Sequence, residues 1–581
     1  MLQLGDKPVR SSLLSHHIHQ DINLIFGEKY HRWLFIFGLF LMAASLSLGK
    51  FLIGASLFTL SFNWLFEGSR PDPVWKHYKG KKFSLKSFFR DLAEENLKPK
   101  WRLFKARPAI PILMMIVVLH FIGILWSPDQ HAAWNDLKIK LPLLIVPLII
   151  GTTQPLNKKM FELLLLTFVL AVFVSSVSTM LIAHGYLPTK KPINNLRDAS
   201  VFVPLIRLSL MCALSVFFLG RWIVREKRIL LRVTAVILII WFLWFLQYMQ
   251  SLTGLVILFL GGFILVVSMF FIYRKRIAAV VLICFFIAGI LIAGSLANRF
   301  YKNNFTTLPV DMAHLNDTTK YGNPYAHDLN YPMIENGNQV MVYYCWPELD
   351  SAWTKRSKIP FTGKDVNGDQ ICFTIMRYLS STGSRKDANA IEKLSEAEVH
   401  AIENGATNEF DSLRSPLERR AYQVCWELHN YFYGGSPSGN SVTMRMEFAQ
   451  TALTTIKQYP WIGVGTGGQQ KSYEKVYHSY GTKLEREYQW MHAHNQFLSI
   501  AVCLGIPALL YFIFSLWYAP RRMKRWRSYL YLAFFLVLCM SFFDDDTLET
   551  SQGVNFFAFF NSLFLFAMPR DSALRGEEKG N

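Results

Sequence analysis

Apolar residues gather along this chain into long blocks, and short basic segments separate the blocks. A block of about 20 apolar residues forms a helix long enough to cross the hydrocarbon core of a bilayer. The pattern therefore predicts an all-α polytopic membrane protein with about 12 transmembrane helices. The predicted spanning segments are 33–49, 51–66, 109–126, 139–152, 160–184, 200–222, 231–248, 253–273, 277–296, 496–518, 528–543 and 553–568.

One long polar stretch interrupts this pattern and divides the chain. Residues 1–296 are expected to form an N-terminal transmembrane bundle of about nine helices. Residues 297–493 are long enough to fold as a separate, mainly helical domain, and residues 494–581 form about three C-terminal helices with a tail. Helix start and stop signals occur within the polar stretch. They predict helices over 394–405, 415–432 and 440–460.

The distribution of basic residues predicts the orientation of these helices. Cytoplasmic loops are enriched in Lys and Arg, and loop 67–108 carries twelve of them against five acidic residues. Segments 221–232, 274–276 and 521–527 are basic as well and fall on the same side of a twelve-helix arrangement. Both termini are therefore expected in the cytoplasm, and 297–493 on the opposite side. The net charge of +20 is assigned to this orientation, so no nucleic-acid partner is expected.

Composition limits the cysteine chemistry and the presequence. Three of the seven cysteines lie in the polar stretch, so one disulfide at most is expected there. No Cys/His spacing typical of a zinc site is present. No cleavable signal peptide is expected, because residues 1–30 lack an apolar core. The three cysteines are Cys345, Cys372 and Cys425.

Two arginines are candidates for anion binding. Arg207 lies about two turns inside segment 200–222, where an arginine costs roughly 2.5–3.5 kcal/mol on insertion. It either extends to the interface or faces an anion in a cavity. Arg445 lies on the predicted helix 440–460, just before the glycine run 459–468. That run lacks the Gly-Lys-Ser/Thr of a P-loop and is expected to allow close backbone approach.

Two histidines, His492 and His494, precede the apolar segment 496–518. Such residues can cap a helix, bind a metal ion or act as a general base. No third ligand lies at a usable spacing, so no metal is predicted. The acidic turn, residues 544–553, is expected to be solvated, or else to orient a basic residue. Arginine forks with a histidine nearby suit a phosphate ester and the deprotonation of a hydroxyl.

Four separated pieces of the chain resemble the O-antigen ligase/polymerase superfamily of bacterial membrane glycosyltransferases. The resemblance implies an enzyme of the bacterial inner membrane, with its site facing the periplasm. It also implies a donor glycan carried on undecaprenyl diphosphate and inverting transfer to an acceptor hydroxyl, with no metal and no other cofactor. The pieces are LWSPDQHAAWNDLKIKLPLLIVPLII (125–150), VFVPLIRLSL (201–210), SVTMRMEFAQTALTTIKQYPWIGVGTGG (441–468) and HNQFLSIAVCLGIPALL (494–510).

The resemblance also implies roles for individual residues. The superfamily's essential arginines match Arg207 and Arg445, which are expected to hold the diphosphate, and its essential histidine matches His494, which is expected to act on the acceptor hydroxyl. Many relatives carry a Ser-Arg pair where this chain has Ser251 and Leu252, so no third arginine is inferred there. The expected supporting residues are Asn495, His492 and Arg197.

The leading expectation is an O-antigen ligase that transfers the glycan to a lipid A–core sugar hydroxyl. An O-antigen or polysaccharide polymerase and a protein O-oligosaccharyltransferase share the site and stay open as alternatives. A transporter is disfavoured, because transporters place polar groups at the midplane and contain internal repeats. Here the charged candidates gather at one face of the membrane, and the sequence contains no visible repeat.

Overall fold

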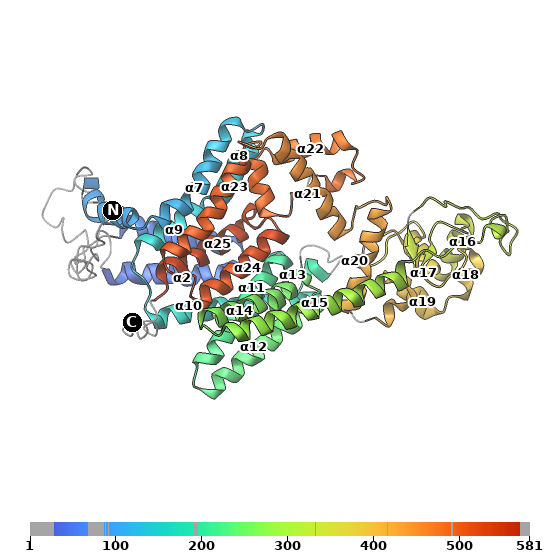
Figure 1. Ribbon diagram of the computed structural model, residues 1–581, viewed down its shortest axis with the longest axis horizontal. Helices are drawn as coiled ribbons and strands as arrows, with labels where there is room; N and C mark the ends of the chain where they lie inside the picture. Colours follow the sequence, from blue (N-terminus) through green and yellow to red (C-terminus); the bar gives the residue numbers. More distant parts are fainter. Residues whose placement is uncertain are drawn as a thin grey trace.

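The computed structural model describes residues 28–67, 86, 89–90, 92–189, 196–331, 333–414, 416–489 and 492–569. It is almost entirely helical: a bundle at one end and a smaller distal domain at the other (Figure 1). Eight described helices are long and apolar enough to cross a membrane. They are α2 (Glu28–Leu48), α7 (Ala109–Gly123) with η2 (Ile124–Trp126), α10 (Lys158–Ala183), α11 (Leu205–Arg225), α12 (Ile229–Tyr248), α13 (Leu252–Val256) continuing through η4 (Ile257–Gly261) and α14 (Gly262–Ile272), α15 (Arg276–Phe305) and α23 (Gln496–Arg522).

The remaining predicted spans form shorter helices, so length and composition support eight spans and not the full twelve. Predicted span 139–152 is divided, because α8 ends at Lys140 and Pro142 begins α9. The 11 residues of α9 extend about 16 Å, roughly half of the hydrocarbon core. These elements are α3 (Lys50–Phe66), α8 (Gln130–Lys140), α9 (Pro142–Thr152), α24 (Tyr529–Asp544), and α25 (Ser551–Ser562) with η9 (Leu563–Ala567).

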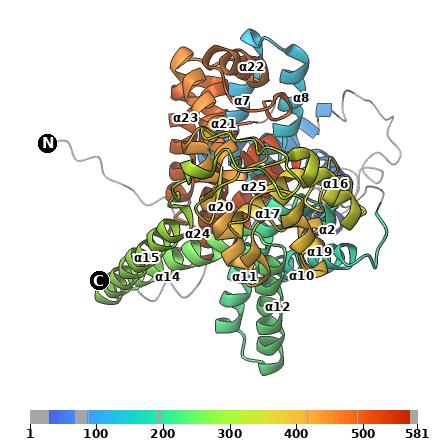
Figure 2. The ribbon, with the colours of Figure 1, turned by 90° about the vertical axis from the view of Figure 1, so that its right-hand side faces the viewer.

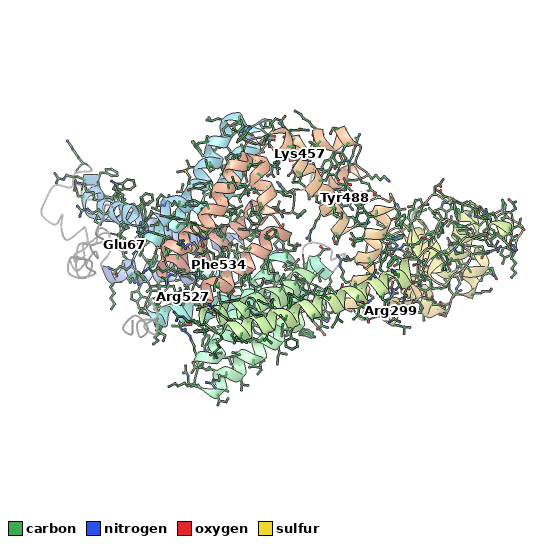
Figure 3. The ribbon with its side chains drawn as sticks, in the orientation of Figure 1. Glu67, Arg299, Lys457, Tyr488, Arg527 and Phe534 are labelled. Carbon is green, nitrogen blue, oxygen red and sulfur yellow. The ribbon has the colours of Figure 1, made fainter. Side chains whose placement is uncertain are left out.

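The bundle is organised around α25 and η9. Residues of this pair are buried on all sides, which is typical of a helix in the middle of a bundle. Phe560 lies edge-on to Phe168 of α10 with ring centroids 4.7 Å apart. Phe534 of α24 also contacts Phe560, with ring centroids 6.0 Å apart. Figure 3 marks Phe534 inside the bundle. Aromatic pairs of this kind stabilise beyond the area that they bury.

A single long helix joins the bundle to the distal domain. The 30 residues of α15 extend about 45 Å, and the helix continues to Phe305, past the predicted span 277–296. Figures 1 and 2 show its far end running into the distal domain, and Figure 3 marks Arg299 on this part. There Phe305 packs with Ile334, Tyr422 and Trp426. The other elements are η1 (Leu92–Leu97), α6 (Lys98–Ala106), η3 (Leu196–Ala199), η5 (Met312–His314), β1 (Ile334–Glu335), β2 (Asn338–Gln339), α16 (Trp346–Arg356), α17 (Ile371–Ser381), α18 (Ala388–Lys393), α19 (Glu396–Glu403), η6 (Glu409–Ser412), α20 (Pro416–Phe432), α21 (Ser441–Gln458), α22 (Gln469–Tyr480), η7 (Arg486–Tyr488) and η8 (Thr547–Glu549).

The distal domain, residues 306–432, has its own core. Fully buried Trp353 lies among apolar side chains from α16, α17, α18 and α19, and the two-stranded antiparallel sheet β1–β2 borders them. The three helices predicted in the polar stretch are confirmed as α19, α20 and α21. Ser395 begins α19 with a capping box, as its sequence pattern predicts. All seven cysteines are free, including the three for which one disulfide was allowed.

Part of the predicted topology lies outside the described residues. This holds for residues 1–27, residues 570–581 and most of the basic loop 67–108. The cytoplasmic position of both termini therefore stays a prediction.

Candidate active site

The glycine run 459–468 packs directly against a break in α23. Gly505 has φ +82° and interrupts the helix, which leaves carbonyl groups on its last intact turn without helical partners. The N–H of Gly465 donates to the carbonyl of Cys503 at 2.9 Å. A Cβ at Gly463 would collide with the backbone of Cys503. The predicted close backbone approach is confirmed, and it fixes α21 beside the start of α23.

The acidic turn follows α24 and contains three successive aspartates that the sequence does not assign to the site. The expectation that this turn is solvated is wrong, because Asp545 and Asp546 are buried. Each of the three carboxylates faces a residue that the sequence does single out. A buried carboxylate is costly unless it is paired. Three successive aspartates between two apolar helices were therefore the feature of the sequence that indicated basic partners for this turn.

The first predicted pair, Arg207 and His494, meets at Asp545. Arg207 lies in the first turn of α11, is 5% exposed, and places Nη1 2.5 Å from Asp545 Oδ2. The other carboxylate oxygen, Oδ1, lies 3.4 Å from His494 Nδ1. Asp545 thus connects the arginine of α11 with the histidine before α23.

The backbone and the electrostatics at this junction follow from that packing. His494 has φ +47°, an uncommon conformation that directs its ring toward the acidic turn and Phe448, whose ring centroid is 5.6 Å away. Burial alone would raise the pKa of Asp545. The hydrogen bond with His494 and the charge of Arg207 outweigh burial and hold the pKa of Asp545 well below its usual range. Asp545 is therefore ionised at neutral pH.

The second predicted arginine pairs with the neighbouring aspartate. Arg445 Nη1 lies 2.6 Å from Asp544 Oδ1, and Thr253 donates its hydroxyl to Asp544 Oδ2 at 2.7 Å. The Arg445 side chain is 36% exposed, in contrast to the enclosed Arg207. Consecutive carboxylates thus bind the two predicted arginines, which brings α11, α21 and α24 together at one end of the bundle.

The predicted supporting residues have different positions. His492 contacts Gln469 at 2.8 Å and lies 3.9 Å from Asp546. Burial and the hydrogen bond with Asp545 raise the pKa of Asp546 to about 6. Asn495 caps α23 by accepting hydrogen bonds from the N–H groups of the first turn. The side chain of Arg197 lies outside the described residues.

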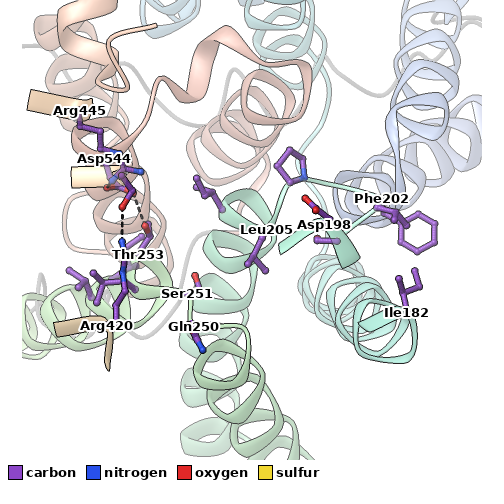
Figure 4. A pocket seen from close by; sticks show the side chains of 18 of the residues that line it. Ile182, Asp198, Phe202, Leu205, Gln250, Ser251, Thr253, Arg420, Arg445 and Asp544 are labelled. Atoms are coloured by element: carbon purple, nitrogen blue, oxygen red, sulfur yellow. Dashed lines mark hydrogen bonds and ion pairs between the residues drawn. The ribbon is translucent and has the colours of Figure 1, made fainter. Parts of the chain in front are cut away.

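A large cavity of about 1340 Å³ opens beside Arg445 and Asp544. One wall carries polar groups from α20, α21 and α24, and another is apolar, with Ile182 and Phe202 (Figure 4). Neither Arg207 nor His494 lines it. The cavity therefore combines apolar surface with charged groups next to the Arg207–Asp545–His494 chain of contacts.

A buried lysine missed from the sequence anchors the far end of the acidic turn. Lys140 of α8 is 1% exposed and lies 2.6 Å from Glu549, with Asp136 on its other side. Gln496 of α23 accepts a hydrogen bond from the N–H of Leu548 at 2.6 Å. The acidic turn is thus held from α8, α11, α21 and α23 together. Lys140 lies in one of the sequence pieces that carry the resemblance, but nothing there marks its ion pair.

Three potential metal ligands occur together in the described residues. Atoms of His494, Asp545 and Asp546 lie within 4.8 Å of one another and could hold an ion. One of the Asp545 oxygens, Oδ2, is already paired with the Arg207 guanidinium. The absence of a metal therefore stays a prediction, and chelation tests it.

Comparison with known families supports the predicted relationship. Residues 404–513 match the family model described as O-antigen ligase, which confirms the resemblance found in the sequence. The matched segment contains Arg445, His492, His494 and Asn495. No curated protein matches the chain. The family match and the eight apolar helices together indicate a multi-pass membrane protein with a glycosyltransferase-like role.

Proposed function

We propose that this protein is an O-antigen ligase that transfers a glycan from undecaprenyl diphosphate to a sugar hydroxyl of lipid A–core at the periplasmic face of the inner membrane. The observation that carries the proposal is the chain of contacts Arg207–Asp545–His494 beside the Arg445–Asp544 pair. It places two guanidinium groups and one imidazole at the same end of the bundle, next to a cavity with an apolar wall.

The histidine would act on the acceptor. With Nδ1 directed at the Asp545 carboxylate, the imidazole carries its proton on Nδ1 and leaves Nε2 free as an acceptor. Nε2 takes the proton of the acceptor hydroxyl as its oxygen attacks C1 of the donor sugar. The ionised Asp545 stabilises the imidazolium that results, so this pair performs general-base catalysis without a metal.

The arginines would act on the donor. As the new O–C1 bond forms, the bond from C1 to the diphosphate oxygen breaks, and its electron pair leaves with undecaprenyl diphosphate. Arg207 and Arg445 bind the diphosphate and stabilise the charge that develops on it. The acceptor attacks from the face opposite the leaving group, so the configuration at C1 inverts. In the resting site, Asp545 and Asp544 occupy the positions on the two arginines that phosphate oxygens would take.

The decisive experiment is analysis of lipopolysaccharide from a deletion strain complemented with wild-type or variant protein. Core without attached O-antigen in the deletion strain, restored by wild type and not by His494→Ala, supports the ligase. Core bearing a single repeat unit indicates a polymerase instead. Unchanged lipopolysaccharide in the deletion strain contradicts both.

A further inference from the structure

Of the two arginines expected from the sequence, Arg445 lines the cavity and Arg207 does not. Among the described lining residues, Arg420 and Arg445 are the cations. Arg207 lies against Asp545 outside the lining. The sequence gives Arg420 no prominence, because it appears as one charge of an amphipathic helix. Its position on α20 nevertheless directs it to the same polar wall as Arg445 (Figure 4).

The contacts of Arg420 are mostly with neutral oxygens. Its Nη2 donates to Ser441 Oγ at 2.6 Å, and its Nη1 donates to Gln423 Oε1 at 2.8 Å. The nearest carboxylate that it contacts, Glu427, is farther away at 3.5 Å. Hydrogen bonds between two charged groups are stronger than those to neutral acceptors. The two short hydrogen bonds of Arg420 thus go to neutral oxygens, and a phosphate oxygen that replaces either of them forms a stronger, charge-assisted bond, while buried Glu427 stays at the longer distance.

Ser441 links the two arginines. It begins α21 and also lines the cavity, four residues before Arg445, so both lie on one face of that helix. The lining also contains two carboxylates, Asp544, which is paired with Arg445, and Asp198 beside Phe202, and the two cations lie together at the wall of α20 and α21. A phosphate group in the cavity is therefore attracted to the wall formed by Arg420, Ser441 and Arg445.

The distal domain holds Arg420 in place. On another face of α20, Tyr422 donates its hydroxyl to buried Glu335 at 2.6 Å, and Trp426 donates to the carbonyl of Ile334. Arg377 lies over the Trp426 ring at 3.7 Å and pairs with Glu335 at 2.6 Å. The helix that carries Arg420 is thus fixed to the rest of the distal domain.

We propose that Arg420, Ser441 and Arg445 form a phosphate subsite of the cavity, in which Arg420 binds the diphosphate of the lipid-linked donor together with Arg445. This inference rests on the proposed function for the identity of the ligand. The apolar wall would receive the first part of the lipid chain. The distal domain, through α20, then contributes directly to donor binding.

Binding of inorganic pyrophosphate to the purified full-length protein in lipid nanodiscs tests the subsite. A charge-assisted hydrogen bond contributes about 1.5–3 kcal/mol, so Arg420→Ala should weaken pyrophosphate binding roughly ten- to hundredfold. Arg420→Lys, which keeps the charge but loses the fork, should fall between wild type and Arg420→Ala. Exposed Arg419, the neighbour on α20 that does not line the cavity, provides the matched control. Arg419→Ala should bind within about twofold of wild type.

Transfer kinetics separate this inference from the proposed function. In Arg420→Ala the KM for the lipid-linked donor should rise while the KM for the acceptor is unchanged. Should Arg420→Ala not fold, Arg420→Gln removes the charge and keeps a polar, unbranched side chain, although its amide ends short of the position from which Arg420 Nη2 donates to Ser441. Wild-type affinity for pyrophosphate in either folded variant overturns the subsite, even where transfer occurs. Arg420-dependent pyrophosphate binding without any glycan transfer by wild type would retain the subsite and overturn the function.

Discussion

Replacing Asp545 by Asn tests the central junction of the proposed site. The change keeps the shape of the side chain and removes the charge between Arg207 and His494. Arg207 is 5% exposed, so it would be left as an unpaired buried cation. Breaking one partner of a buried pair costs about 3–5 kcal/mol, so we expect a lower Tm. General-base catalysis contributes about 10²–10⁴-fold, and we expect kcat for glycan transfer to fall within that range.

A double variant separates the loss of stability from the loss of catalysis. Arg207→Met combined with Asp545→Leu removes both charges, and replacement of a buried pair by apolar groups is often neutral. Its Tm should recover toward wild type while transfer stays absent. Asp546→Asn is the neighbouring control, because Asp546 lies farther from His494, at 3.9 Å. Transfer by Asp545→Asn within threefold of wild type, or an equal loss in Asp546→Asn, would refute the assigned role of Asp545.

Three further predictions concern the same region. The pKa of Asp546 is raised to about 6, so the stability that the protonated carboxyl contributes is present below pH 3.8 and lost as pH rises through 6. Asp546→Asn should therefore raise the free energy of unfolding by about 3 kcal/mol at pH 8 and leave it unchanged at pH 3.5, measured by thermal unfolding. Gly553→Ala would drive a Cβ into the carbonyl of Thr547 and displace the acidic turn, so transfer should be lost, whereas Gly220→Ala, whose Cβ would make an ordinary contact with the Tyr529 hydroxyl at 3.9 Å, should behave as wild type. EDTA should leave transfer unchanged; loss of transfer restored by a divalent ion would instead assign His494, Asp545 and Asp546 as ligands.

Apolar periodicity predicted the fold class because lipid demands long apolar helices whatever their neighbours are. It could not count the spans, because α9 and α25 are short and completed by packing within the bundle. The acidic turn was misjudged for a related reason. Whether a carboxylate is solvated or buried depends on tertiary partners, and those of Asp545 are 338 and 51 residues away along the chain.

The sequence singled out some residues of the candidate site and passed over others for the same physical reason. Arg207 and His494 are polar groups at the edges of apolar helices, where a local pattern marks them as costly. Arg420 and Lys140 lie on amphipathic helices, where a charged residue is ordinary. Only the packing of α20 beside α21, and of α8 beside the acidic turn, distinguishes them from solvated charges.

The arrangement of the aspartates has a consequence for the order of events in the proposed reaction. Asp545 contacts Arg207 through one carboxylate oxygen and His494 through the other. A diphosphate that binds Arg207 would therefore compete with Asp545 for the guanidinium. Asp545 would then interact chiefly with His494 and stabilise the imidazolium more strongly, because the competing cation has been neutralised by phosphate. Donor binding would therefore leave the Asp545 carboxylate directed chiefly at His494. An acceptor hydroxyl would be activated only when a sugar is present to receive it, which limits futile deprotonation in the empty site.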